Sequence, residues 1–208
     1  ARLPDGRSGI EAMLAAMEQA IRGLPEAYRV AIVEFHDRNI DPQVLSSLTG
    51  EREAALQSVE EFARSMFEPG SSRVWDSIDT AATLFSSGVE NPNAVRSIVF
   101  VSDGRDTSSI ATRSDAGDLA IAGGIQLYAL GVGEVYEEGA LAELARSTGG
   151  VYYPIKELGE LEDQPRQLIA DLLGQYKVSY ITLRREGLYQ MMIEVDIPLA
   201  IGSFESQT

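Results

Sequence analysis

The sequence predicts an α/β domain built on a doubly wound, mostly parallel sheet flanked by helices, with a C-terminal β-hairpin extension. Short β-branched runs alternate with amphipathic helical patterns over residues 1–174, and this alternation is typical of parallel sheets covered on both faces. The clearest strand, at residues 95–101, is followed by Asp103 and Gly104. Ligands bind at the carboxyl ends of strands in open α/β sheets, so Asp103 stands where ligand chemistry is expected.

The composition excludes several classes of function. The formal net charge of −15 repels phosphate backbones, so no nucleic-acid partner is expected. There is no cysteine, which excludes disulfides, thiolate metal sites and cysteine nucleophiles. His36 is the single histidine, so the chain has little material for nucleophilic catalysis and we expect no enzyme. No apolar run approaches the roughly 18 residues of a membrane span, so none is expected in this chain.

The first half of the chain is predicted to alternate between helices and strands. Apolar residues recur at helical spacing in three segments, and β-branched runs separate them. The predicted helices are residues 10–23, 51–66 and 73–86, and the predicted strands are residues 28–35, 41–48 and 95–101. Pro42 marks the strand at 41–48 as an edge strand, because proline cannot donate to a sheet ladder. Trp75 is expected to be a helix residue that packs under the preceding loop rather than one that binds a ligand.

The second half continues the alternation and then changes character. Its predicted helices are residues 114–122, 138–147 and 158–173, and its predicted strands are residues 125–132 and 151–154. Pro165 predicts a kink or a late start in the last helix. Residues 175–184 and 188–198 each alternate around a turn, which predicts the hairpin. The expected domains are therefore residues 1–174 and residues 175–208.

Five pieces of the sequence, in order, match one family. They are residues 29–35, 70–78, 98–107, 124–133 and 148–153. Together they resemble the von Willebrand factor type A (vWA) domain of the bacterial kind, over residues 10–174. The resemblance implies the Rossmann-like vWA fold and a metal-ion-dependent adhesion site (MIDAS), at which a bound Mg²⁺ is completed by an acidic group of a partner protein.

The resemblance also implies which residues hold the cation. Carried over position by position, Ser72 matches the family's Thr or Ser ligand and Asp103 matches its later Asp ligand. Mg²⁺ prefers hard oxygen ligands, and Mn²⁺ or Ca²⁺ are alternatives. The surrounding rim is expected to include Asp106, Thr107 and His36. A second interpretation stays open for most of these residues, since Ser72 can cap the helix after it and Asp106 and Thr107 can order their own loop.

One part of the family's pattern is absent from these residues. The family's first strand ends in Asp-x-Ser-x-Ser and lies in the middle of the sheet, between the strands predicted at 28–35 and 95–101, and no segment here matches it. A sheet without its centre leaves backbone groups unpaired, at about 1–3 kcal/mol for each buried group. We therefore expect these two strands not to pair directly. A further segment or a separate chain is expected to supply the strand and the remaining metal ligands, or another segment such as the C-terminal hairpin to replace the strand.

Two functions follow as hypotheses. The first is a protein-binding, adhesion-type module that recognises a partner through the MIDAS rim, with the metal held once the missing ligands are supplied. The second is a scaffold or assembly subunit of a larger complex, with no metal-dependent binding. The absence of cysteine and the hairpin favour an exported or cell-surface bacterial protein, and a cytoplasmic protein is the alternative.

Overall fold

The computed structural model describes residues 9–35, 41–64, 72–88, 94–102, 105–132 and 138–174. The chain divides into two units, Ala1–Tyr176 and Lys177–Thr208, and all the described residues belong to the first. The helices are α1 (Gly9–Gly23), α2 (Arg52–Arg64), α3 (Val74–Gly88), α4 (Arg113–Gly123), α5 (Glu138–Ser147), the short 3-10 helix η1 (Leu158–Glu162) and α6 (Gln164–Leu173). The strands are β1 (Val30–Glu34), β2 (Gln43–Thr49), β3 (Arg96–Ser102), β4 (Ile125–Val132) and β5 (Tyr152–Ile155).

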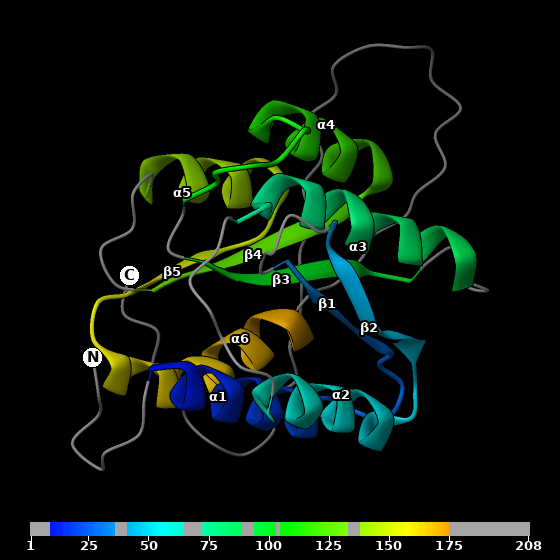
Figure 1. Cartoon of the computed structure of the whole chain (residues 1–208), viewed down its shortest axis with the longest axis vertical. Coiled ribbons are helices and arrows are strands. Elements are labelled where there is room, and N and C mark those ends of the chain that lie inside the picture. Colours follow the sequence, from blue (N-terminus) through cyan, green and yellow to red (C-terminus); the bar gives the residue numbers. More distant parts are fainter. Residues whose placement is uncertain are drawn as a thin grey trace, which may run out of the picture. The chain divides into compact units, whose positions relative to one another are not determined.

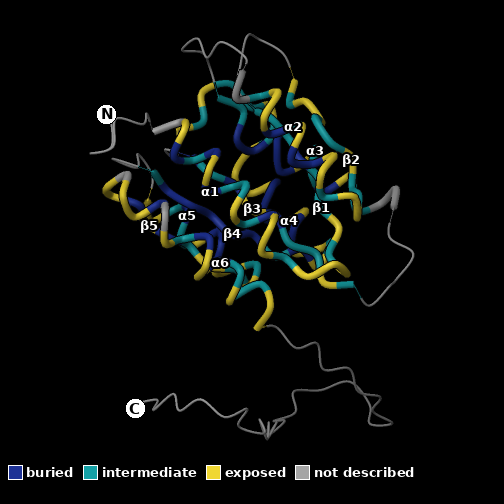
Figure 2. The backbone as a smooth tube through the Cα atoms, turned by 90° about the horizontal axis from the view of Figure 1, so that it is seen from below, coloured by how far each residue is buried: buried dark blue, intermediate teal, exposed yellow. Residues whose placement is uncertain are grey.

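Three strands form a parallel sheet in the order β3-β4-β5. Val99 of β3 lies opposite Tyr128 of β4, and Ala129 of β4 lies opposite Tyr152 of β5. The central strand β4 is buried along nearly its whole length (Figure 2). A strand covered on both faces has to be apolar at successive positions, which explains its continuous apolar run.

The other two strands form a separate antiparallel pair, β1-β2. Val30 lies opposite Thr49 and Glu34 opposite Gln43, with two irregularities in register between them. Proline 42 directly precedes β2, so the edge strand begins after the residue that could not donate to the ladder.

Helices cover both sides of the strands. Figure 1 shows α3, α4 and α5 on one side and α1, α2 and α6 on the other. On the first side, Ile98 and Phe100 of β3 join Leu127 of β4 in a buried cluster with residues of the three helices. On the second side, Tyr128 and Leu130 of β4 pack with residues of α1 and α6. The predicted α/β fold with helices on both faces is confirmed.

Most predicted elements agree with the structure to within a few residues. The main adjustment is the last predicted helix, at 158–173, which is divided into η1 and α6. Pro165 lies in the first turn of α6, where its missing N–H has no intrahelical partner to lose, so the predicted late start is confirmed. The predicted helix at 51–66 runs past the described residues after Arg64, and the predicted hairpin at 175–198 lies outside them and stays a prediction.

The described strands confirm that β1 and β3 are not hydrogen-bonded neighbours. Each is the last strand of its own sheet, because β1 pairs with β2 and β3 pairs with β4. The topology of the described strands therefore agrees with the expectation that these two strands do not pair directly. Within the described ranges, no helix has both the length and the apolar character needed to cross a membrane.

Candidate functional site

Ser72 lies two residues before the start of α3 and is joined to a loop more than thirty residues further along the chain. Its backbone N–H donates to Thr107 Oγ1 at 2.8 Å. Its carbonyl oxygen accepts from the backbone N–H groups of Thr107 at 3.0 Å and Ser108 at 3.2 Å. The structure thus brings together two residues, Ser72 and Thr107, that the sequence placed at the rim for separate reasons.

Asp106 caps the first turn of α3 from this distant loop. Its Oδ1 accepts from the backbone N–H of Val74 at 2.8 Å and from Ser109 Oγ at 2.7 Å. Ser109 Oγ in turn lies 3.1 Å from the backbone nitrogen of Trp75 and accepts its N–H. A helix begins with N–H groups that have no intrahelical partner, and a negative charge at that end is also favoured by the helix dipole. The capping interaction therefore fixes the loop against α3.

Asp76, in the first turn of α3, holds the same loop from the opposite direction. Its carboxylate accepts from the backbone N–H of Ile110 at 3.0 Å and from that of Ala111 at 2.9 Å. Arg73 Nη1 lies 3.5 Å from the Asp76 carboxylate and 2.9 Å from that of Asp41. Two carboxylates, one on each side, thus lock the loop to the helix.

The loop ends in a capping box at the start of α4. Thr112 accepts from the backbone N–H of Asp115, and the Asp115 carboxylate accepts from the backbone N–H of Thr112 at 2.8 Å. The hydrogen bonds from Thr112 lower the pKa of the Asp115 carboxyl. Residues 106–115 are therefore held by α3 at one end and by α4 at the other.

The oxygen atoms of the described rim residues that could bind a cation differ in whether they already accept or donate hydrogen bonds. The Ser72 hydroxyl makes no hydrogen bond to the described residues, whereas the Asp106 carboxylate is occupied by the cap. Within the described ranges no three acidic or histidine side chains are grouped as metal ligands would be. Asp103 and His36 lie outside the described residues. The described part of the rim thus fits one ligand position, that of Ser72, and does not fit a complete metal site.

The first turn of α3 is capped by residues that the sequence did not indicate as caps of this helix. The sequence left open that Ser72 caps the helix after it, but among the described residues Asp106 and Ser109 make the side-chain contacts to the first turn of α3. The expectation that Asp106 and Thr107 order the loop agrees with these hydrogen bonds. Ser109 and Asp76 were missed. Their only sequence signal was a Ser-rich stretch after a strand and an acidic residue in a first helical turn, and neither reveals that the two segments meet.

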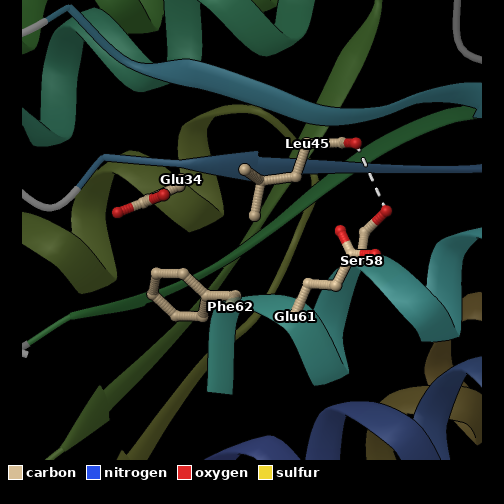
Figure 3. Close-up of a pocket in the computed structure, with 5 residues that line it drawn as sticks. All are labelled: Glu34, Leu45, Ser58, Glu61 and Phe62. Carbon is tan, nitrogen blue, oxygen red and sulfur yellow. Dashed lines mark hydrogen bonds between the residues drawn. The ribbon is translucent and has the colours of Figure 1, made fainter. Parts of the chain in front are cut away.

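A separate hollow of about 220 Å³ lies between α2 and the β1-β2 pair. Its lining is drawn in Figure 3 and comprises Glu34, Leu45, Ser58, Glu61 and Phe62. Ser58 Oγ donates to the Leu45 carbonyl oxygen at 3.2 Å across it. Of the residues predicted for the rim, the three that the structure describes, Ser72, Asp106 and Thr107, do not line this hollow.

Comparisons with solved structures agree with the fold. An aerotolerance-related membrane protein from Bacteroides fragilis NCTC 9343 is 18% identical, with a TM-score of 0.59 over 80% of this chain and 90% of that chain. A von Willebrand factor type A protein from Catenulispora acidiphila is 22% identical, with a TM-score of 0.64 over 77% of this chain and 37% of that chain. Proximal thread matrix protein 1 from the mussel byssus, in a form with a zinc-occupied MIDAS motif, is 12% identical, with a TM-score of 0.65 over 81% of this chain and 44% of that chain.

The sequence itself supports the same assignment. A search of curated proteins finds no match. The family model described as von Willebrand factor type A domain matches residues 6–167, which is most of the chain. Together with the parallel sheet and its flanking helices, this match confirms the resemblance noted from the sequence. The chain belongs to the von Willebrand factor type A domain family.

Proposed function

We propose that this domain is a protein-binding module that recognises an acidic group of a partner protein through a divalent cation at the rim. The observation that carries the proposal is the setting of Ser72. Its backbone is fixed by Thr107 and Ser108, while its hydroxyl makes no hydrogen bond to the described residues. A hydroxyl that is held in place and makes no hydrogen bond within the described residues is suited to act as a ligand of a hard cation.

The proposed ligands are Ser72 and Asp103, with Mg²⁺ as the preferred ion and Mn²⁺ or Ca²⁺ as alternatives. Asp103 follows the last residue of β3, Ser102, directly in the sequence. When bound, the cation would offer its open position to a carboxylate of the partner. The remaining ligands would come from a segment outside these residues. Asp106 supports the site by holding the loop, and Thr107 and His36 are proposed to line the surface that the partner touches.

A location outside the cytoplasm, at the bacterial cell surface, is also proposed. It is supported by the similarity to a protein whose name describes an aerotolerance-related membrane protein. The formal net charge of −15 adds to the need for a cation, since an acidic partner group would otherwise approach a negative protein. Cell adhesion is one use of such a module. The proposed role of this domain is to bind a partner protein and not to catalyse a reaction.

The test is a titration of the chain with Mn²⁺ in which binding is measured from the relaxation of water protons. Ser72→Ala and Asp103→Ala are expected to weaken Mn²⁺ binding by about tenfold or more, since each removes one of few ligands. Ser114→Ala and Asp118→Ala, on the exposed surface of α4, are the matched controls and should bind as the parent does. The peptide Gly-Glu-Gly with blocked termini should change the relaxation of water protons by the bound Mn²⁺, and Gly-Gln-Gly with blocked termini, which has no carboxylate, should not.

The same titration separates the two candidate functions. Loss of binding in both rim variants, with the controls unchanged, supports the cation-dependent module. Binding that is equal in the parent and both rim variants contradicts the proposal. That result would favour the scaffold or assembly subunit, in which the domain contacts other proteins without a metal.

A further inference from the structure

We propose that Ile110 is an apolar anchor for the partner protein, and that it selects a partner segment in which an apolar side chain lies close in sequence to a carboxylate. The inference rests on the proposed function and deepens it, because Ile110 belongs to the loop that is hydrogen-bonded to Ser72. It names a residue that determines specificity and the chemistry of the segment that this residue selects.

The side chain of Ile110 is the most exposed large apolar side chain among the described residues. It is 86% exposed, whereas Ile121, the next in order, is 55% exposed. A single exposed apolar side chain is common on protein surfaces and by itself indicates no binding site. Ile110 is distinguished by the loop that carries it, because this loop is fixed to α3 and α4 and contacts Ser72.

The backbone on both sides of Ile110 is held by hydrogen bonds. Its own N–H donates to the two oxygens of the Asp76 carboxylate at 3.0 Å and 3.1 Å, and the N–H of Ala111 donates to the same group at 2.9 Å. On the preceding side, the Ser109 hydroxyl donates to Asp106 Oδ1 at 2.7 Å. None of these hydrogen bonds uses the Ile110 side chain. The side chain is therefore presented on a backbone that is already ordered, which lowers the entropy lost when a partner covers it.

The exposed charges on either side of Ile110 in the loop are positive. Residues 105–113 contain two exposed arginines, Arg105 and Arg113, and a single acidic residue, Asp106, whose carboxylate caps α3. In a chain with a formal net charge of −15, this loop therefore favours an acidic segment that the protein as a whole would repel. An apolar side chain between two arginines is complementary to a segment that combines apolar and acidic residues.

The distance along the chain limits how far apart those two partner groups can be. The carbonyl oxygen of Ser72 accepts from the backbone N–H of Thr107 at 3.0 Å, and Ile110 follows Thr107 by three residues. Three residues of chain span at most about 11 Å. An extended segment advances by about 3.3 Å per residue, so one segment can reach both the cation and Ile110 when its carboxylate and its apolar side chain are about four residues apart or closer.

The test measures whether Ile110 selects an apolar residue near a glutamate. The probes are nine-residue peptides with blocked termini, a central glutamate, a leucine at one of the other positions, and glycine or serine elsewhere. A reference peptide has no leucine. Binding to the full chain is followed from the NMR chemical shifts of the backbone amides of residues 105–113, in Mg²⁺ and again in EDTA. With leucine at the best position, the dissociation constant should fall by about tenfold relative to the reference, as expected for burying one aliphatic side chain.

Two serine variants show whether this gain comes from Ile110. Ile110→Ser should reduce the gain to less than about twofold, since the hydroxymethyl group offers little apolar surface, while the hydrogen bonds that hold the loop use only the backbone N–H of residue 110. Ile121→Ser, which changes an exposed isoleucine of α4 outside the loop, is the matched control and should keep the gain. The amide spectrum of each variant checks that it is folded.

The inference is overturned if leucine gives no gain at any position, or if Ile110→Ser keeps the gain that the parent shows. The proposed function is judged from a different readout, the Mg²⁺-dependent binding of the reference peptide, which Asp103→Ala should weaken. Binding of the reference peptide that is equal in the parent and in Asp103→Ala contradicts the proposed function, whatever the gain from leucine.

Discussion

Replacing Asp106 by alanine should destabilise the domain by about 2 kcal/mol, because this carboxylate caps α3. Its Oδ1 accepts from the Val74 backbone N–H at 2.8 Å and from Ser109 Oγ at 2.7 Å, and its Oδ2 receives a longer contact of 3.4 Å from the Ser109 backbone N–H. Loss of an N-cap costs about 1 kcal/mol, and half-buried donors left without an acceptor cost about 1 kcal/mol more. For a chain of this size, the midpoint of thermal unfolding should fall by about 4–8 °C.

The assay is urea unfolding followed by circular dichroism, with the free energy extrapolated to water. Asp106→Asn should lose less than half as much stability, since asparagine is as good an N-cap as aspartate. Asp118→Ala, on the exposed surface of α4, should stay within about 0.5 kcal/mol of the parent. The reasoning is refuted if Asp106→Ala is as stable as the Asp118 control, or if Asp106→Asn is as damaging as the alanine variant.

Two further predictions concern the packing and the pH dependence of the sheet. Gly150→Ala should lower the free energy of unfolding in urea by about 3 kcal/mol or more, because the added Cβ would lie 2.0 Å from the backbone oxygen of Leu127. In the control Gly139→Ala the added Cβ meets open space, so this variant should be as stable as the parent or slightly more stable. Equal stabilities of the two variants would contradict the prediction. Tyr153 is buried and donates to the Asp171 carboxylate, and its burial together with this carboxylate raises the pKa of the phenol above its usual 10.0. The unfolded chain therefore loses this proton at a lower pH than the folded chain, so the free energy of unfolding should fall as the pH rises above about 10. In Tyr153→Phe the free energy of unfolding should fall less between pH 8 and pH 11. An identical fall in the parent and the variant would exclude the assignment.

Much of the fold was readable from local patterns. The run at β4 is almost continuously apolar because both faces of the parallel sheet are covered there, and this pattern can be recognised without knowing which segments cover it. Pro165 predicted the late start of α6 for a similarly local reason, since a proline is tolerated in the first turn of a helix. The rim was only partly predictable. Ser72 and Thr107 were singled out, but the contact between them was not, because it joins segments 35 residues apart.

By itself, the sequence determined the order of the elements, the position of Asp103 after an apolar strand, and the similarity to the vWA family that the family model then confirmed. Those properties depend on residue types at short spacing, which survive as patterns along one chain. Only the tertiary structure decided that Asp106 caps α3 and that Asp76 holds the loop around Ile110. Hydrogen bonds between distant segments depend on how the chain returns to itself, and no local spacing records that.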